Sequence, residues 1–145
     1  AMGTWGTGNF DSDTALDFTA ELVDGLSVQI ACALGLRTGA GCDHNGPGDL
    51  EEVEGPVMAR VGTILMLVDG GASGAPDPII VTRWRDAMLR LWDAQKHTLG
   101  GRADYLRDRR CEIAATFERL LAWGINGGRN RGTPPRLCAG GRNAG

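Results

Sequence analysis

The sequence contains a single lysine, Lys96, and only two histidines, His44 and His97. A serine or cysteine nucleophile needs an activating base within hydrogen-bond reach, and neither histidine stands in a recognisable catalytic motif. The phosphate-binding pattern G-x-x-x-x-G-K-[ST] is also absent from the chain. These absences favour a non-enzymatic protein, for which we expect no catalytic residue and no cofactor.

Long apolar runs are missing too, since no stretch approaches the roughly 18 residues that a membrane span needs. No cationic segment followed by an apolar run marks a secretory signal, so we expect a cytoplasmic protein. The four cysteines form no C-x-x-C pair, and in a cytoplasmic chain we expect free thiols. Cys42 and His44 offer two metal ligands, but a zinc site normally needs four converging groups. We therefore expect no metal site.

Charge is distributed unevenly along the chain, although the net charge is only -3. Residues 1–77 hold twelve acidic residues against Arg37 and Arg60, whereas residues 78–123 hold nine basic residues against six acidic ones. Two interpretations follow. The acidic N-terminal half docks against the basic C-terminal half, or the acidic half recruits a charged partner.

The first helix is expected to begin at Asp13, or one residue either side, and to run to about Leu34, because apolar residues recur there at helical spacing. Gly35 should end it in the left-handed conformation. Its inward face is predicted to comprise Leu16, Ala20, Val23, Ser27, Ile30 and Leu34. A second apolar row predicts that the helix is covered on two sides: Phe18, Leu22 and Leu26. An acidic row occupies what remains: Asp13, Asp17, Glu21 and Asp24.

The next helical stretch is interrupted by Gly55-Pro56, and proline breaks a helix interior. We predict a short helix over 49–54, opened by Asp49 and Glu52 in a variant of the capping box. A longer helix from Pro56 to about Val68 should be the most apolar element and the central helix of the bundle. Its β-branched stretch leaves a buried strand as the alternative.

Two further helices are predicted, over residues 77–97 and 103–123, with Gly124 closing the last one. Asp86 and Arg90 are spaced for an ion pair within the earlier helix. The inward residues predicted for that helix are Ile80, Trp84, Met88, Leu91 and Trp92. Those predicted for the last helix are Tyr105, Leu106, Ile113, Phe117, Leu120 and Leu121.

Together these patterns predict a single all-α domain over residues 1–123, a bundle of about four main helices with glycine-rich loops and an irregular N-terminal segment. Residues 124–145 form a Gly/Arg-rich C-terminal tail without apolar periodicity. Four arginines in that tail predict, at most, weak and salt-sensitive contacts with nucleic acid. We expect no other nucleic-acid binding and no membrane association.

The segment before the first helix is the most distinctive part of the sequence. Trp5 and Phe10 are large apolar residues that a soluble domain normally buries, and three glycines between residues 3 and 8 give the backbone freedom to turn. We interpret the segment as a structural plug that tucks both rings under the bundle. Asp11 and Asp13 are then expected to cap the first helix, although D-x-D spacing could also present two oxygens to a cation.

The stretch Met-Gly-Thr-Trp-Gly-Thr-Gly-Asn-Phe-Asp-Ser-Asp-Thr-Ala-Leu-Asp, residues 2–17, resembles the opening of a bacterial family, domain of unknown function 4259. Members of that family begin M-G-[TA]-W-G-x-G-x-F-x-[ND]-D-x-A-x-D. Residues 84–93 and 112–120 resemble its C-terminal helices, whereas residues 35–76 resemble it only loosely. The resemblance implies a small helical cytoplasmic protein of bacteria and implies no catalytic residue.

The function predicted from these observations is a non-enzymatic protein-interaction module that uses its acidic N-terminal half. An immunity-like or regulatory role suits it by analogy, and the partner is another protein or a second copy of the chain. The alternative is a small-ligand-binding protein or small enzyme with a pocket beneath the Trp5 loop. The candidate binding residues are Trp5, Asp11, Asp13, Asp17, Glu21 and Arg109.

Overall fold

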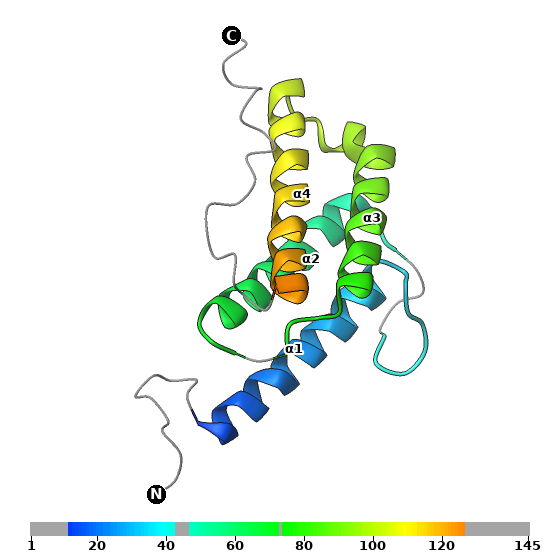
Figure 1. The fold of residues 1–145 in the computed structure, drawn as a ribbon. Helices are drawn as coiled ribbons and strands as arrows, with labels where there is room; N and C mark the ends of the chain where they lie inside the picture. The colour runs from blue at the N-terminus through cyan, green and yellow to red at the C-terminus, as the bar shows by residue number, and fades with distance from the viewer. Residues whose placement is uncertain (1–11, 43–46, 73, 127–145) are drawn as a thin grey trace, which may run out of the picture.

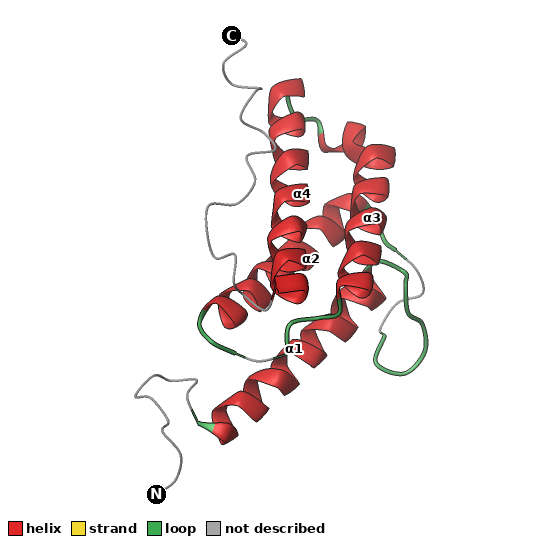
Figure 2. Ribbon diagram, in the orientation of Figure 1, coloured by secondary structure: helices red, strands yellow, loops and turns green. Residues whose placement is uncertain are grey.

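The computed structural model describes residues 12–42, 47–72 and 74–126. Within them the chain forms four α-helices, one short 3-10 helix and no strand (Figures 1 and 2). The predicted all-α class is confirmed. No helix in this part of the chain combines the length and the apolar character needed to cross a lipid bilayer.

Helix α1, Asp13–Ala33, has the predicted bounds. Its N-cap is Ser12, whose hydroxyl accepts a hydrogen bond from the Ala15 amide at 3.1 Å. The expectation that Asp13 is the cap was therefore wrong, because Asp13 is the first helical residue. At the other end Gly35 has the predicted positive φ, of 74°. The Gly35 amide donates to the carbonyl of Cys32 at 3.1 Å, and the Leu36 amide donates to that of Ala31 at 2.9 Å. This is the hydrogen-bond pattern of the Schellman motif.

Helix α2, Leu50–Asp69, is continuous through Pro56, so the predicted break at Gly55-Pro56 was wrong. Proline removes one intrahelical hydrogen bond, but Pro56 is exposed, so that this part of the helix is open to hydration. Val53 and Val57 on either side of it are buried in the core. Tertiary packing of both flanks thus outweighs the local cost of the proline, and the strand alternative is excluded.

The start of α2 is fixed by another helix and not by a capping box. Asp49 is the N-cap as predicted, but its side chain makes no capping hydrogen bond. Instead the amide of fully buried Leu50 donates to Oε1 of Gln95 at 2.8 Å. A long-range contact therefore satisfies the first amide of the helix, which has no acceptor within the helix.

Helix α3, Pro78–Gln95, is followed by the 3-10 helix η1, Lys96–Leu99. Its buried stripe contains Trp84, Met88 and Trp92, as predicted, whereas Ile80 is exposed and the adjacent Val81 is buried instead. The predicted pair between Asp86 and Arg90 does not form, because Asp86 pairs with the neighbouring Arg85 at 3.2 Å.

Helix α4, Ala103–Asn126, runs past Gly124, so the prediction that this glycine closes the helix was wrong. A Cβ at Gly124 would lie 2.9 Å from Cγ of Pro78 and 3.1 Å from the carbonyl oxygen of Pro76. Gly124 is therefore the point where α4 approaches the loop before α3. Ile113, Phe117 and Leu120 face the core, but Tyr105 is exposed, contrary to prediction.

The core lies around α2, which contacts α1, α3 and α4, so the predicted central helix is confirmed. Helix α1 packs mainly against α2, while α3 and α4 form the most extensive helix pair. In consequence the N-terminal half of α1 projects beyond the other helices (Figure 1).

Candidate functional site

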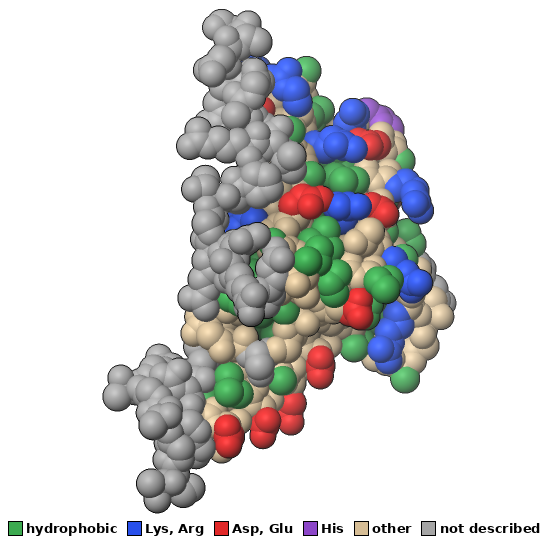
Figure 3. All heavy atoms as spheres, viewed as in Figure 1, with side chains coloured by type: hydrophobic (Ala, Val, Ile, Leu, Met, Phe, Trp, Pro, Cys, Tyr) green, Lys and Arg blue, Asp and Glu red, His purple; other side chains and the backbone are tan. Residues whose placement is uncertain are grey.

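The projecting half of α1 carries a row of four carboxylates, which we call the acidic row. Its members recur at intervals of three or four residues, which places them along one side of the helix: Asp13, Asp17, Glu21 and Asp24. All four are exposed. Figure 3 shows carboxylates along the edge of the molecule that α1 forms, with no basic side chain beside them on that face. Neighbouring like charges at this spacing repel one another.

None of the four forms an ion pair within the described part of the chain, whereas carboxylates on the other helices do. Glu54 of α2 accepts from Nε of Arg109 on α4 at 2.6 Å, and Asp69 at the end of α2 pairs with Arg119 at 3.6 Å. These pairs join the acidic half to the basic half, as the first of the two interpretations of the charge distribution predicted. These pairs use α2, however, and none of the described basic residues pairs with the acidic row of α1.

The best-formed pair links α3 to α4. Both carboxylate oxygens of Asp93 accept from the guanidinium of Arg110, at 2.8 and 2.9 Å, the bidentate arrangement that arginine favours. Hydrogen bonding from Arg110 holds the pKa of Asp93 below its ordinary value. Arg85 and Glu118 form a second link between the same helices, at 2.6 Å.

Two apolar side chains lie next to the acidic row on α1. Phe18 is 60% exposed and Leu22 is 41% exposed, and at a spacing of four residues they are neighbours on the helix surface. We call them the outer apolar row. The prediction that α1 is covered on two sides was wrong for both residues, although Leu26 of the same row does pack against the core.

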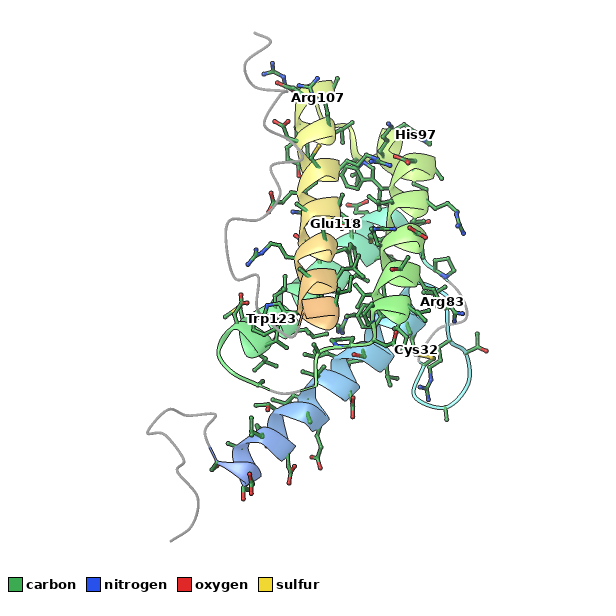
Figure 4. All side chains as sticks on the ribbon, in the orientation of Figure 1. Cys32, Arg83, His97, Arg107, Glu118 and Trp123 are labelled. Atoms are coloured by element: carbon green, nitrogen blue, oxygen red, sulfur yellow. A yellow bond between two sulfur atoms is a disulfide. The ribbon has the colours of Figure 1, made fainter. Side chains whose placement is uncertain are left out.

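The predicted site residues do not converge. Trp5 and Asp11 lie outside the described residues. Asp13, Asp17 and Glu21 lie together on α1, but Arg109 pairs with Glu54. Figure 4 places Arg107, two residues before Arg109, at the far end of α4 from the start of α1. Arg109 therefore does not line a site with Asp13.

The cysteines differ from the sequence-based expectation. Cys32 in the last turn of α1 and Cys42 in the following loop form a disulfide, with their Cα atoms 5.3 Å apart. The expectation of free thiols was wrong for this pair, and Cys42 has no thiolate to offer a metal. Cys111 is a free, half-buried thiol, whereas His44 and Cys138 lie outside the described residues.

The signal that sequence reasoning missed is the glycine-directed turn between Cys32 and Cys42. Gly35, Gly39 and Gly41 all have positive φ, a conformation that glycine adopts without steric cost. They reverse the chain within the ten residues that separate the two cysteines.

Other chemistry is limited in the part of the chain that the structure describes. No group of three or more histidine, cysteine, aspartate or glutamate side chains is placed there to hold a metal ion. His97 is exposed in η1, at the end of α3 remote from α1 (Figure 4). What the acidic row can do is attract and bind positive charge.

Comparison with known proteins agrees with the resemblance seen at the N-terminus. Neither the curated proteins nor the solved structures contain a match to this chain. Residues 84–93 and 112–120 lie outside the family match, so the resemblance predicted there stays a prediction. The match covers the segment before α1, the whole of α1 and the first residues of the loop that follows. Residues 3–38 match the model of the family described as Domain of unknown function (DUF4259).

Proposed function

We propose that this chain is a non-enzymatic protein-interaction module that binds a basic partner protein through the acidic row of α1. The proposal rests on a difference in ion pairing between α1 and the other three helices. The four carboxylates of α1 are exposed and have no ion-pair partner in the described part of the chain, whereas α2, α3 and α4 exchange ion pairs with one another.

The spacing of the row sets the chemistry of the partner. A rise of about 1.5 Å per residue places carboxylates four residues apart at intervals of about 6 Å. A basic helix repeats lysine or arginine at the same interval, so several pairs form together. A single exposed pair contributes less than about 1 kcal/mol, and binding therefore depends on the whole row and weakens as salt rises.

A regulatory or immunity-like role is compatible with this mode of binding, because masking a basic surface needs charge and shape but no catalytic group. A second copy of the chain is the rival partner. Arg83 and Arg90 are exposed on α3, seven residues apart, and form no ion pair with a described residue.

The test is affinity capture from a lysate of the source organism with three forms of the protein. The test variant carries Asp17→Asn, Glu21→Gln and Asp24→Asn and leaves Asp13 in the first turn of α1. The matched control carries Glu51→Gln, Glu52→Gln and Glu112→Gln, three exposed carboxylates outside α1 that form no ion pair with a described residue. Both variants lose the same charge.

We expect wild type and control to capture the same protein, which elutes as salt is raised, and the test variant to lose it. Equal capture by all three forms would contradict the proposal. A co-purifying small molecule with no protein partner would instead favour the pocket beneath the Trp5 loop. A dimer of the pure protein that the test variant abolishes would identify a second copy as the partner.

The cytoplasm remains the proposed location, and the disulfide provides its test. The structure contains the Cys32–Cys42 disulfide, and disulfides are rare in reducing compartments. A cytoplasmic location therefore requires this bond to be reduced in the cell and to form on isolation. Acid quenching followed by alkylation and mass spectrometry measures their state. A fully oxidised pair at the moment of quenching would contradict a cytoplasmic location.

A further inference from the structure

We propose that the basic partner presents an amphipathic helix to α1, and that apolar side chains of this helix pack on the outer apolar row, Phe18 and Leu22. This inference rests on the proposed function and deepens it, because it names the kind of surface that binds to the same side of α1. The N-terminal half of α1 carries the outer apolar row and most of the acidic row. That half projects beyond the other helices, so its outer side is accessible (Figure 1).

The two rows lie side by side on α1. Phe18 directly follows Asp17, and Leu22 directly follows Glu21. Successive residues of an α-helix are rotated by about 100° around its axis, so the two rows together occupy about half of the helix circumference. Val23, the residue after Leu22, is buried on the opposite side. The outer half of α1 is therefore acidic along one edge and apolar along the other.

The fold gives the outer apolar row no place in the core. Phe18 is 60% exposed and Leu22 is 41% exposed, and neither packs on the core as Leu26 does. Taking apolar surface out of water is favourable, whereas ion pairs between exposed charges weaken as salt rises. A partner that covers this row therefore keeps part of its affinity at high salt.

The charge beside the apolar row limits the class of partner. The four exposed carboxylates of the acidic row repel the phosphates of nucleic acids and of anionic lipids, which proteins bind with lysine and arginine. A protein surface with basic side chains next to apolar ones is attracted instead. The outer side of α1 thus selects a protein surface that is both basic and apolar.

The spacing within the rows favours a helix as the form of that surface. An extended segment docks through backbone hydrogen bonds on the edge of a sheet, and residues 12–42, 47–72 and 74–126 contain no strand. An amphipathic helix binds through side chains at positions i and i+4, the interval between Phe18 and Leu22. Asp13 and Asp24 are eleven residues apart, so about three turns of partner helix cover both rows.

The probe is a synthetic alanine-based peptide of about 20 residues, because shorter peptides are only marginally helical in water. Its lysines recur at every third or fourth position, and a leucine directly follows two lysines that are four residues apart. A control peptide has the same composition, with both leucines moved to the side opposite the lysines. Fluorescence anisotropy with the full chain measures the affinity of each peptide at low and at high salt.

We expect wild type to bind the probe at least about tenfold more tightly than the control peptide at high salt, and Phe18→Ala, Leu22→Ala to abolish that difference. The matched control is Ile79→Ala, Ile80→Ala on α3, where the two side chains are 66% and 44% exposed; it should leave the difference unchanged. Equal affinity of wild type for the two peptides, or a difference that survives Phe18→Ala, Leu22→Ala, would overturn the inference.

The charge variant Asp17→Asn, Glu21→Gln, Asp24→Asn separates this inference from the proposed function. Weaker binding of both peptides at low salt supports the acidic row, whatever the outcome for the apolar row. Unchanged binding of both peptides would refute the proposed function, and the inference with it. Sedimentation of the protein alone completes the test: a dimer that Phe18→Ala, Leu22→Ala dissociates would show that a second copy covers the apolar row and would overturn the inference.

Discussion

Gly124 and Gly62 are both glycines inside helices, and the structure predicts opposite outcomes when each is changed to alanine. Alanine is more favourable than glycine in a helix interior by about 1 kcal/mol. A Cβ at Gly62 would meet nothing within 4 Å, whereas a Cβ at Gly124 would meet Cγ of Pro78 at 2.9 Å and the Pro76 carbonyl oxygen at 3.1 Å. A proline ring and a backbone carbonyl group cannot move away from an added Cβ as readily as the end of a flexible side chain can.

The expected changes in the free energy of unfolding follow from the gain in helix propensity and from the steric cost of the added Cβ. Gly62→Ala should raise the free energy of unfolding by up to about 1 kcal/mol. Gly124→Ala gains a smaller propensity term near the end of α4, and overpacking costs about 1–3 kcal/mol. We therefore expect Gly124→Ala to lower the free energy of unfolding by about 1–2 kcal/mol, once the propensity gain is subtracted from the overpacking cost.

Urea denaturation followed by circular dichroism measures both variants against wild type. Equal m-values would show that each change acts on stability alone. If Gly124→Ala were as stabilising as Gly62→Ala, α4 would not approach the loop before α3 as described. The reasoning about the end of α4 would then be refuted.

Three further predictions concern the same fold. Pro56→Ala restores a missing hydrogen bond inside α2 and should stabilise the protein by about 1–3 kcal/mol; an unchanged urea midpoint would contradict a continuous α2. Replacing Cys32 and Cys42 by serine reopens a ten-residue loop and should cost about 2–3 kcal/mol by the chain-entropy relation, measured by thermal unfolding of oxidised wild type and variant. The lowered pKa of Asp93 means that its ion pair stabilises fully above the unfolded-state pKa of about 3.9 and is lost as pH falls through the folded-state pKa. The stability difference between wild type and Asp93→Asn should therefore shrink as pH falls through the folded-state pKa of Asp93 and vanish once that carboxyl group is protonated in both states, and a difference that persists under those conditions would contradict this assignment.

Helix periodicity was sufficient to predict the all-α class, the four main helices and most of the side chains that form the core. Trp84, Met88 and Phe117 are buried as their spacing indicated, because a 3.6-residue repeat of apolar side chains has one stable arrangement around a shared core. The capping and helix-breaking rules failed at the end of α4 and at the start of α2, where residues distant in the sequence contact the helix. Gly124 lies inside α4 at a position where Pro78 leaves no room for a Cβ, and the first amide of α2 donates to Gln95.

The candidate site was predicted only in part. The acidic row of α1 follows from spacing alone, since a helix aligns Asp17, Glu21 and Asp24 whatever surrounds it. Whether those carboxylates form ion pairs does not follow from their spacing, because ion pairing depends on which helices pack together. Arg109 was predicted to belong to the same binding site as Asp13, whereas in the structure it pairs with Glu54 of α2.

Site-specific photo-crosslinking tests the central claim most directly, namely that the acidic row of α1 is the partner-binding surface. Gly25 lies beside that row and is exposed. A Cβ added there meets nothing within 4 Å, so we choose this position for benzoylphenylalanine. The same replacement at Met66 on α2 is the control. We predict a crosslinked partner in source cells from position 25, none from position 66, and loss of the product when Glu21→Gln and Asp24→Asn are added. Crosslinking from position 66 alone, or a product at position 25 that is indifferent to those two changes, would contradict the claim.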